Sequence, residues 1–326
     1  MMKVFVTRQI PEPGLALLRK EFDVEVNPFD RVLQKQELMK AVKGKDGLLC
    51  LLTDPVDKDV VYAEPNLKMI ASYAVGYDNI DVKAATERGI PVSNTPGVLT
   101  DTTAELAWAL VFAVARRIVE SDRFMRDGKF TGWAPMLMLG QDLSNKTLGI
   151  IGAGRIGTAV ALKSKGFNMK ILYTDEQHSD LLEQKLHAKK VSLPDLLRQA
   201  DVVSVHVPLT KETHHLIGER ELRMMKPTAI LVNTARGPIV DEHALVKALQ
   251  EHRIFGAGLD VYEQEPLIPQ ELRILPNIVL QPHTGSGTIE TRTKMALMAA
   301  DNLIAGLQGK IPPNCVNKEV FTKPKY

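Results

Sequence analysis

The stretch that decides the fold is Leu148-Gly149-Ile150-Ile151-Gly152-Ala153-Gly154-Arg155-Ile156-Gly157, in which an apolar strand pattern runs directly into G-x-G-x-x-G. A helical pattern, residues 158–165, follows it. In such a turn the first glycine allows a tight bend, the second lets the backbone approach a diphosphate, and the third lets helix and strand pack closely. Free N–H groups at the helix N-terminus favour the anion. The stretch therefore predicts a dinucleotide-binding βαβ unit, and the residues expected to touch the cofactor here are Gly152, Ala153, Gly154, Arg155, Ile156 and Gly157.

The next strand pattern, residues 170–174, is followed by an acidic residue, Asp175. A carboxylate at this place in the unit accepts hydrogen bonds from the adenosine ribose hydroxyls and repels a 2′-phosphate. Glu176 and Gln177 after it add no cation that would bind such a phosphate. We therefore expect NAD as the cofactor, with NADH preferred and NADP not excluded. A helix N-cap is the alternative role for Asp175.

Strand and helix patterns alternate on both sides of this unit, as in parallel sheets with crossover helices. In the second part of the chain six strand patterns predict a complete doubly wound sheet: 147–151, 170–174, 201–207, 229–233, 256–260 and 277–280. In the first part the strand patterns are 3–7, 47–52, 68–72 and 91–93. An amphipathic helix over 102–127, opened by the capping-box spacing of Thr102 and Glu105, joins the two parts, and a helix over 288–308 follows the second. Spacing alone leaves open whether the tail after that helix returns to the first part.

Composition excludes several function classes. Lys plus Arg is 41 and Asp plus Glu is 39, a net charge of +2, which supplies no field for holding nucleic acid or an anionic membrane. Cys50 and Cys315 cannot form a disulfide framework, and neither is spaced from a His as a zinc knuckle requires. The N-terminus lacks a signal-peptide pattern, and the longest apolar run, 106–115, is too short to span a bilayer. We expect a cytoplasmic protein without a metal.

Polar and ionisable residues follow the strand patterns of the second part, at the edge where open α/β sheets bind ligands. Arg236, Glu265 and His283 come after three of these strands and could face a nicotinamide ring together. As a set they suit reduction of a 2-oxo acid, because a guanidinium binds a carboxylate or polarises a carbonyl, an imidazole donates a proton, and a carboxylate fixes the imidazole. Two alternatives stay open at this point: Glu263 could take the place of Glu265, and Arg236 could simply pair with Asp241.

Short motifs occur in a fixed order through nearly the whole chain: LLTD at 51–54, SYAVGYDNID at 72–81, NTP at 94–96, LTDTTAE at 99–105, GW at 132–133, the glycine motif, NTARG at 233–237, GLDV at 258–261, EP at 265–266 and PH at 282–283. With these motifs the sequence resembles the D-isomer-specific 2-hydroxyacid dehydrogenase family, most closely its glyoxylate/hydroxypyruvate reductase branch. Thr284 and Gly287 depart from it, since the family usually has Ile and Ala there. Asp175 and Glu176 also depart, since several glyoxylate reductases carry basic or hydroxyl residues there for NADP.

The resemblance implies roles for particular residues. In the family pattern Arg236, Glu265 and His283 form the catalytic trio, which leaves Glu263 outside it. The backbone amides of the residues at 75 and 76 are implied to hold the substrate carboxylate, and a tryptophan is implied to reach the site of a neighbouring subunit. The implied substrate contacts are Leu52, Val75, Gly76, Trp133, Arg236 and His283. Beyond the glycine motif and Asp175, the implied cofactor contacts are Thr103, Val207, Pro208, Thr234, Ala235, Arg236, Asp260, His283 and Gly285.

The resemblance also implies the architecture and the activity. A doubly wound parallel-sheet NAD-binding Rossmann domain, 100–286, would be inserted into a discontinuous flavodoxin-like α/β substrate domain, 1–99 and 287–326. Two chains would form a homodimer, largely through the cofactor domains. The implied reaction is NADH-dependent reduction of glyoxylate or hydroxypyruvate to the D-2-hydroxy acid. The alternatives are a phosphoglycerate-type or 2-ketogluconate-type dehydrogenase and, in a different class, a corepressor-like protein that binds NAD as a sensor.

Overall fold

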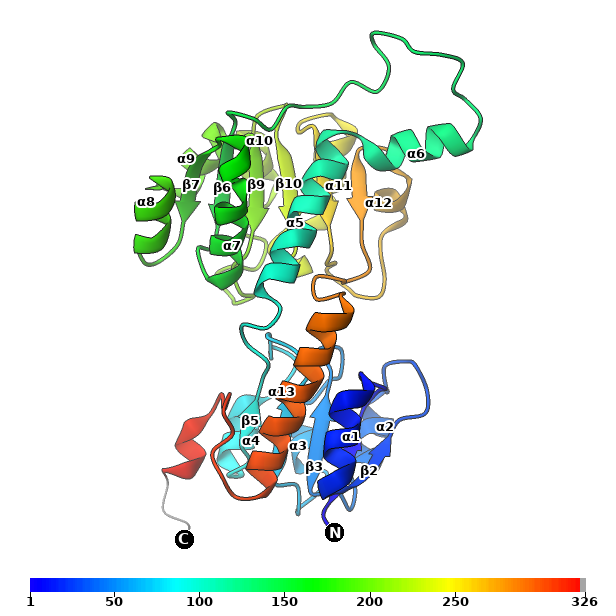
Figure 1. Cartoon of the computed structure of the whole chain (residues 1–326), viewed down its shortest axis with the longest axis vertical. Helices are drawn as coiled ribbons and strands as arrows, with labels where there is room; N and C mark the ends of the chain where they lie inside the picture. Colours follow the sequence, from blue (N-terminus) through cyan, green and yellow to red (C-terminus); the bar gives the residue numbers. More distant parts are fainter. Residues whose placement is uncertain (323–326) are drawn as a thin grey trace. The chain divides into compact units, whose positions relative to one another are not determined.

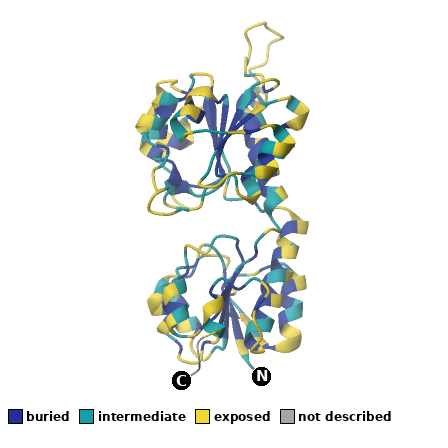
Figure 2. Ribbon diagram, turned by 90° about the vertical axis from the view of Figure 1, so that its left-hand side faces the viewer, coloured by how far each residue is buried: buried dark blue, intermediate teal, exposed yellow. Residues whose placement is uncertain are grey.

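The computed structural model describes residues 1–322, and the last four residues of the expected substrate domain, 323–326, lie outside the described part. The chain divides into two compact units: unit 1 is Met1–Leu99 with Gly287–Tyr326, and unit 2 is Thr100–Ser286. Each unit is a parallel sheet with helices on both faces, and the buried residues gather on the strands (Figures 1 and 2). The predicted α/β class, with two parallel sheets, is confirmed.

Unit 1 is built on a five-stranded parallel sheet in the order β2-β1-β3-β4-β5, which is the flavodoxin-like order. The sequence-based prediction contains neither β2 nor α2. Strand β2 pairs in parallel with β1 from Lys3↔Asp23 to Val6↔Val26. Pairing with β1 therefore makes this segment a strand, and its own short sequence pattern does not predict one. The strands are β1 Lys3–Val6, β2 Asp23–Val26, β3 Gly47–Cys50, β4 Met69–Ser72 and β5 Val92–Ser93, and the helices are α1 Glu12–Glu21, α2 Lys35–Ala41, α3 Lys58–Tyr62, α4 Val82–Glu87, α13 Ile289–Leu307 and η3 Lys318–Phe321.

The two faces of this sheet bury separate apolar cores. Helices α1 and α13 cover one face, and α2, α3 and α4 cover the other. Gly14 lets α1 and α13 approach closely, because a Cβ at that position would lie 2.7 Å from the Cβ of Ala296. The helix over 288–308 that the sequence predicts is therefore α13, which begins after Thr288 and packs on unit 1.

Unit 2 contains a seven-stranded parallel sheet in the order β12-β11-β10-β9-β6-β7-β8, a doubly wound arrangement around β6. The sequence analysis predicts six of these strands and lacks the two-residue β8, which pairs with β7 through Tyr173↔Lys190. The strands are β6 Thr147–Ile151, β7 Lys170–Thr174, β8 Lys189–Lys190, β9 Val202–Val205, β10 Ile230–Asn233, β11 Gly256–Leu259 and β12 Ile278–Leu280, and the helices are α5 Thr100–Ala115, α6 Ile118–Arg126, α7 Arg155–Lys163, η1 Ser164–Phe167, α8 Asp180–Leu186, α9 Leu193–Gln199, α10 Glu219–Met224, η2 Gly237–Ile239, α11 Glu242–Gln250 and α12 Gln270–Ile274.

The single helix predicted over 102–127 is wrong: the structure has two helices, α5 and α6. Arg117 between them adopts the left-handed conformation, with φ of 52°. The carbonyl of Ala115, which would continue the helix, instead accepts a hydrogen bond from Gln141 N at 2.8 Å. A residue of the segment that follows α6 therefore occupies the carbonyl at the C-terminus of α5. The predicted N-cap at Thr102 is also wrong, because α5 already begins at Thr100.

No helix within residues 1–322 is both long enough and apolar enough to cross a membrane. The apolar run 106–115 lies instead within α5, where Leu110, Val111 and Val114 are buried. These side chains belong to the core between α5, α7 and the sheet of unit 2. The apolar character of this run is therefore explained by packing.

Candidate active site

The glycine turn connects β6 to α7. Gly152 has φ of +94°, and a Cβ there would lie 2.7 Å from the backbone N of Val207. A Cβ on Gly157 would lie 2.0 Å from Gly152 O, so the first and third glycines are required by close backbone packing. Gly154, just before Arg155 opens the helix, is different, because a Cβ there would meet no atom within 4 Å. The second glycine therefore faces open space beside the free amides of the helix N-terminus, where a diphosphate would bind.

Asp175 lies directly after β7 and reaches the glycine turn. Its Oδ2 accepts a hydrogen bond from Ala153 N at 2.7 Å, and its Oδ1 accepts one from Gln177 N at 3.2 Å. Helix α8 begins only at Asp180, with Ser179 as its N-cap residue, so Asp175 does not cap it. An ionised carboxylate offers about four acceptor sites, which leaves capacity for ribose hydroxyls.

The loops after β9 and β10 contain further predicted cofactor contacts, Val207, Pro208, Thr234 and Ala235. Thr234 is buried, and its Oγ1 has no hydrogen-bond partner among residues 1–322. A buried hydroxyl left unpaired costs about 1–3 kcal/mol, so this group is suited to a ligand. His206 beside these loops bonds the Ser204 hydroxyl through Nε2 at 2.8 Å, and burial lowers the pKa of His206 to about 3, which keeps it neutral.

His283 and Glu265 form the central pair of the site. The Nδ1 atom of His283 lies 2.8 Å from Oε2 of Glu265, and both side chains are about a quarter exposed. Burial opposes ionisation of Glu265, but the hydrogen bond to His283, its charge, the Tyr262 N–H and the nearby Arg236 together lower the pKa of that carboxyl. Because Nδ1 is engaged, Nε2 is the ring nitrogen free to face a reacting oxygen.

The loop that carries His283 is fixed by Asp260. Its carboxylate accepts hydrogen bonds from Thr284 N at 2.6 Å and Gly285 N at 2.8 Å, and its carbonyl accepts from His283 N at 2.9 Å. His283 itself has φ of 53°, a left-handed conformation that this network maintains. The hydroxyl of Thr103 donates to Gly285 O at 3.1 Å. Burial raises the pKa of Asp260, partly offset by these loop N–H groups. Three predicted cofactor contacts, Thr103, Asp260 and Gly285, thus belong to one hydrogen-bond network that holds the loop of His283.

Arg236 is positioned by its neighbours in the loop after β10. The Asn233 side chain donates to Arg236 O at 2.9 Å, and the Arg236 guanidinium donates to Ala235 O at 2.9 Å. Gly237 packs directly against the next loop, because a Cβ there would lie 1.9 Å from the carbonyl carbon of Tyr262. This close approach brings the Arg236 loop against the segment that leads to Glu265.

Glu263, the alternative to Glu265, has a different role in the structure. Its Oε1 accepts a hydrogen bond from Glu242 N, and its own N donates to Oε1 of Glu242, both at 2.8 Å. His215 Nε2 lies 3.2 Å from the same Glu263 oxygen. Glu263 therefore ties the 262–265 loop to α11, while Glu265 bonds His283. Sequence reasoning missed Glu242 and His215, although the Asp241-Glu242 pair at the start of a helix after the Arg236 loop is a signal that could have pointed to this contact.

The predicted substrate contacts of unit 1 lie in loops after β3 and β4. Asn94, which sequence reasoning did not single out, donates from Nδ2 to Val75 O at 2.8 Å. Asn79 donates to Leu51 O at 3.0 Å, next to Leu52. The Asn94 amide thereby fixes the peptide that carries the Gly76 N–H. The peptide that carries the Val75 N–H is fixed by Thr95 N, which donates to Ala74 O at 2.8 Å. Trp133 lies in unit 2 after α6 and is 84% exposed.

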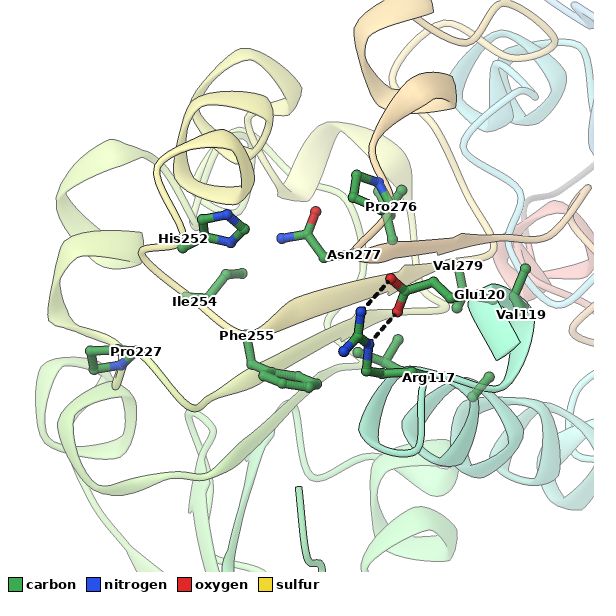
Figure 3. Close-up of a pocket in the computed structure, with 13 residues that line it drawn as sticks. Arg117, Val119, Glu120, Pro227, His252, Ile254, Phe255, Pro276, Asn277 and Val279 are labelled. Atoms are coloured by element: carbon green, nitrogen blue, oxygen red, sulfur yellow. Dashed lines mark hydrogen bonds and ion pairs between the residues drawn. The ribbon is translucent and has the colours of Figure 1, made fainter. Parts of the chain in front are cut away.

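A pocket of about 270 Å³ lies at the amino ends of the unit 2 strands (Figure 3). Its lining includes Phe255 and Asn277, which precede β11 and β12, and the Arg117–Glu120 ion pair. The amino ends of the strands meet here, whereas His283 follows a carboxyl end. The pocket is therefore separate from the His283–Glu265 pair. Within residues 1–322, no group of three or more His, Cys, Asp or Glu side chains could hold a metal ion.

Comparison with known proteins identifies the family. Residues 108–285 match the profile described as D-isomer specific 2-hydroxyacid dehydrogenase, NAD binding domain. The chain belongs to the D-isomer-specific 2-hydroxyacid dehydrogenase family. It is therefore an oxidoreductase, and the predicted family membership is confirmed. The matched segment lies within unit 2.

Relatives extend the similarity over the full length of this dehydrogenase. It is 55% identical to a glyoxylate reductase of Korarchaeum cryptofilum over 98% of this chain and 96% of that one, and 53% identical to a glyoxylate reductase of Thermococcus litoralis over 98% of both. A solved NADPH-dependent glyoxylate/hydroxypyruvate reductase of Sinorhizobium meliloti, in complex with NADP and malonate, is 31% identical with a TM-score of 0.85, over 97% of this chain and 96% of that one.

The site of the dehydrogenase fits NAD. Gly154 leaves open space over the N-terminus of α7, and Asp175 retains acceptor capacity at the end of β7. The buried Thr234 hydroxyl stands without a partner among the described residues at the same sheet edge. These features are separate in the sequence and lie after β6, β7 and β10 of one sheet.

Proposed function

We propose that this dehydrogenase reduces glyoxylate or hydroxypyruvate to the D-2-hydroxy acid with NADH. The observation that carries the proposal is the 2.8 Å contact between His283 Nδ1 and Glu265 Oε2, next to the Arg236 loop and on the same sheet edge as the glycine turn. Full-length relatives at 50–55% identity that are described as glyoxylate reductases support the choice of substrate. Unit 2 would be the cofactor domain and unit 1 the substrate domain.

The reaction adds a hydride to the carbonyl carbon and a proton to its oxygen. Bound NADH would supply the hydride. His283 would donate the proton from Nε2, because Nδ1 is held by Glu265. The lowered pKa of Glu265 keeps its carboxylate ionised at neutral pH, so that it would hold Nδ1 and orient the ring with Nε2 toward the substrate. In the oxidative direction the same imidazole would accept the hydroxyl proton.

Two kinds of group would hold the substrate. Arg236 would bind the carboxylate or polarise the carbonyl oxygen through its planar guanidinium. The backbone N–H groups of Val75 and Gly76 would receive the carboxylate, with Leu52 beside it. The hydrogen bond from Asn94 to Val75 O supports this role, since it fixes the peptide that carries the Gly76 N–H.

We also propose that the protein is a cytoplasmic homodimer. Helix α6 has no buried residue, and its Ile118, Val119 and Met125 are 42–55% exposed. The segment after it exposes Trp133 and Met136, at 84% and 77%. Exposed apolar surface of this extent is typical of a protein–protein interface, and we propose that a second copy of the chain binds there. Light scattering of the purified protein tests this, and a monomer at micromolar concentration would refute it.

Initial rates test the activity. The purified protein should be assayed with NADH and NADPH against glyoxylate, hydroxypyruvate, pyruvate, 2-ketogluconate and phosphohydroxypyruvate. The proposal expects the highest kcat/KM with glyoxylate or hydroxypyruvate and NADH. Preference for one of the last two substrates would assign a different dehydrogenase activity. Equal absence of turnover across the panel, with NADH still bound, would favour a sensor protein.

A further inference from the structure

A cation lies beside the loop that is expected to bind the adenosine ribose. This loop, 175–179, follows β7, and β8 is the neighbouring edge strand. Lys190 on β8 donates from Nζ to the backbone carbonyl of Glu176 at 2.9 Å. Glu176 is adjacent in the chain to Asp175, whose carboxylate bonds the glycine turn. The ammonium of Lys190 is thus one residue away from the proposed ribose ligand.

The surroundings of Lys190 are predominantly acidic. Glu183 on α8 bonds the Tyr173 hydroxyl, and His178 Nδ1 lies 2.9 Å from Glu183 Oε1. Lys190 is among the charges that lower the pKa of Glu183, after the hydrogen bonds from Tyr173 and His178. With Asp175 and Glu176 in the same loop, carboxylates outnumber the cations there. This balance favours a ribose with free hydroxyls over one that carries a phosphate.

We infer that Lys190 is a specificity residue which binds the 2′-phosphate of NADP and so determines how far NADP competes with NAD. The inference rests on the proposed function, because it takes NAD(H) binding at Asp175 as given. A lysine side chain is flexible and can exchange a backbone carbonyl for a phosphate oxygen without moving the sheet. A phosphate oxygen is the stronger acceptor, because the hydrogen bond then joins two charged groups. Asp175 opposes this contact by repelling the same phosphate.

A neighbouring residue provides a matched control. Lys189 precedes Lys190 in β8, pairs with Leu172 and is exposed. Successive side chains of a strand point to opposite faces, so Lys189 carries the same charge on the other face. Removing either lysine changes the net charge of the protein equally. A difference between the two variants therefore reports position and not overall charge.

The experiment measures binding of two small probes, 2′,5′-ADP and 5′-AMP, to the full chain by calorimetry. The variants are Lys190→Met, Lys189→Met, Asp175→Asn and the double variant Asp175→Asn/Lys190→Met. Asp175→Asn should tighten 2′,5′-ADP at least about tenfold, and Lys190→Met should weaken it about tenfold in both backgrounds. Lys189→Met should change neither probe more than twofold, and Lys190→Arg should retain the 2′,5′-ADP affinity. The ratio of kcat/KM for NADPH to that for NADH should follow the same order.

The outcomes separate this inference from the proposed function. If Lys190→Met weakens both probes equally, the lysine only fixes the loop and the inference is wrong, while NAD binding stands. If Lys189→Met has the same effect as Lys190→Met, the effect is overall charge and the inference is again wrong. If 5′-AMP does not bind the wild-type chain at all, the dinucleotide site itself is wrongly placed.

Discussion

The carboxyl ends of the strands carry different side chains in the two parallel sheets. In unit 2 this edge presents ionisable side chains: Glu265 and His283 are each about a quarter exposed and bonded to each other. In unit 1 the carboxyl of Asp54, after β3, is 3% exposed and turned inward, where it accepts hydrogen bonds from Thr7 Oγ1 and Leu51 N. Burial raises the pKa of Asp54, whereas the pKa of Glu265 is lowered. Unit 2 also has a buried carboxyl that fixes a loop, Asp260, but it adds the partly exposed Glu265–His283 pair.

This difference indicates how the work is divided. Side chains of unit 1, such as Asn79 and Asn94, engage loop carbonyls and leave backbone amides available. Backbone amides bind anions but cannot exchange a proton at neutral pH, so unit 1 is suited to recognition. The His283–Glu265 pair can exchange a proton, so unit 2 is suited to chemistry. Substitutions at the two edges should therefore affect different kinetic constants.

The largest effect is expected at His283. Replacing it with Gln removes the proposed proton donor, and kcat should fall on the order of 10³-fold while the affinity for NADH stays within twofold. Stopped-flow or steady-state rates with NADH fluorescence titration measure the two quantities. His187→Gln is the matched control, because His187 is exposed and has φ of 51°, close to the 53° of His283. Retained turnover in His283→Gln would remove this residue from the role of acid.

Glu265→Gln should have the next largest effect, a decrease in kcat on the order of 10², since the imidazole loses the carboxylate that orients it through Nδ1. The variant also changes stability against pH. Because the pKa of Glu265 is lowered in the folded state, its ionisation stabilises the protein above the ordinary value near 4.5, and this stabilisation is lost as the pH falls through the lowered value. Urea unfolding between pH 3 and 7 should therefore show that the free energy of unfolding falls less toward acid pH in Glu265→Gln than in the wild-type chain.

Glu263→Gln is the control for Glu265→Gln. It perturbs the contact with Glu242 and should reduce kcat less than tenfold. An equal decrease in kcat in both variants would contradict the division of roles.

Local patterns were sufficient to predict the parts of the fold that depend on short stretches of sequence. The strand, the glycine turn and the helix at 147–163 follow from the apolar run, the spacing of the glycines and the helical period taken together. Strands β6 and β7 have the predicted bounds. The break between α5 and α6 could not be predicted, because the apolar period continues through it. It depends on Gln141, distant in the sequence, taking the carbonyl of Ala115, and on Gly140, where a Cβ would lie 2.1 Å from that same oxygen.

The candidate site shows the same limit. Position after a strand pointed to Arg236, Glu265 and His283 as a group, but it could not separate Glu265 from Glu263, two residues away. The choice depends on which carboxylate reaches His283, and that is a long-range contact between loops. The buried Thr234 hydroxyl is likewise visible only once the surrounding atoms are placed. Residue type therefore suggests a chemistry, and packing decides which carboxylate contacts His283.

At the unit 1 edge a moderate effect is expected, and on a different constant. Asn94→Ala removes the donor to Val75 O, so KM for the 2-oxo acid should rise about tenfold while kcat and NADH affinity change less than threefold. Asn27→Ala is the matched control, because Asn27 donates a comparable hydrogen bond to Thr7 O at 2.9 Å in the same unit. It should lower stability without raising KM. A fall in kcat with unchanged KM in Asn94→Ala would place unit 1 in the chemistry and overturn the comparison.

The smallest effect compares one helix cap in each unit. Thr288 caps α13 by accepting from Thr291 N at 3.2 Å, and Asp241 caps α11 by accepting from Ala244 N at 3.0 Å. Each change to Ala should lower the free energy of unfolding by about 1 kcal/mol, measured by urea titration. Thr288→Ala should leave kcat and KM unchanged, because its helix only covers the sheet of unit 1. Asp241→Ala should also reduce kcat a few-fold, since α11 begins at Glu242, which holds the loop of Glu265 through Glu263. Equal kinetic constants in the two variants would show that α11 does not position the catalytic pair.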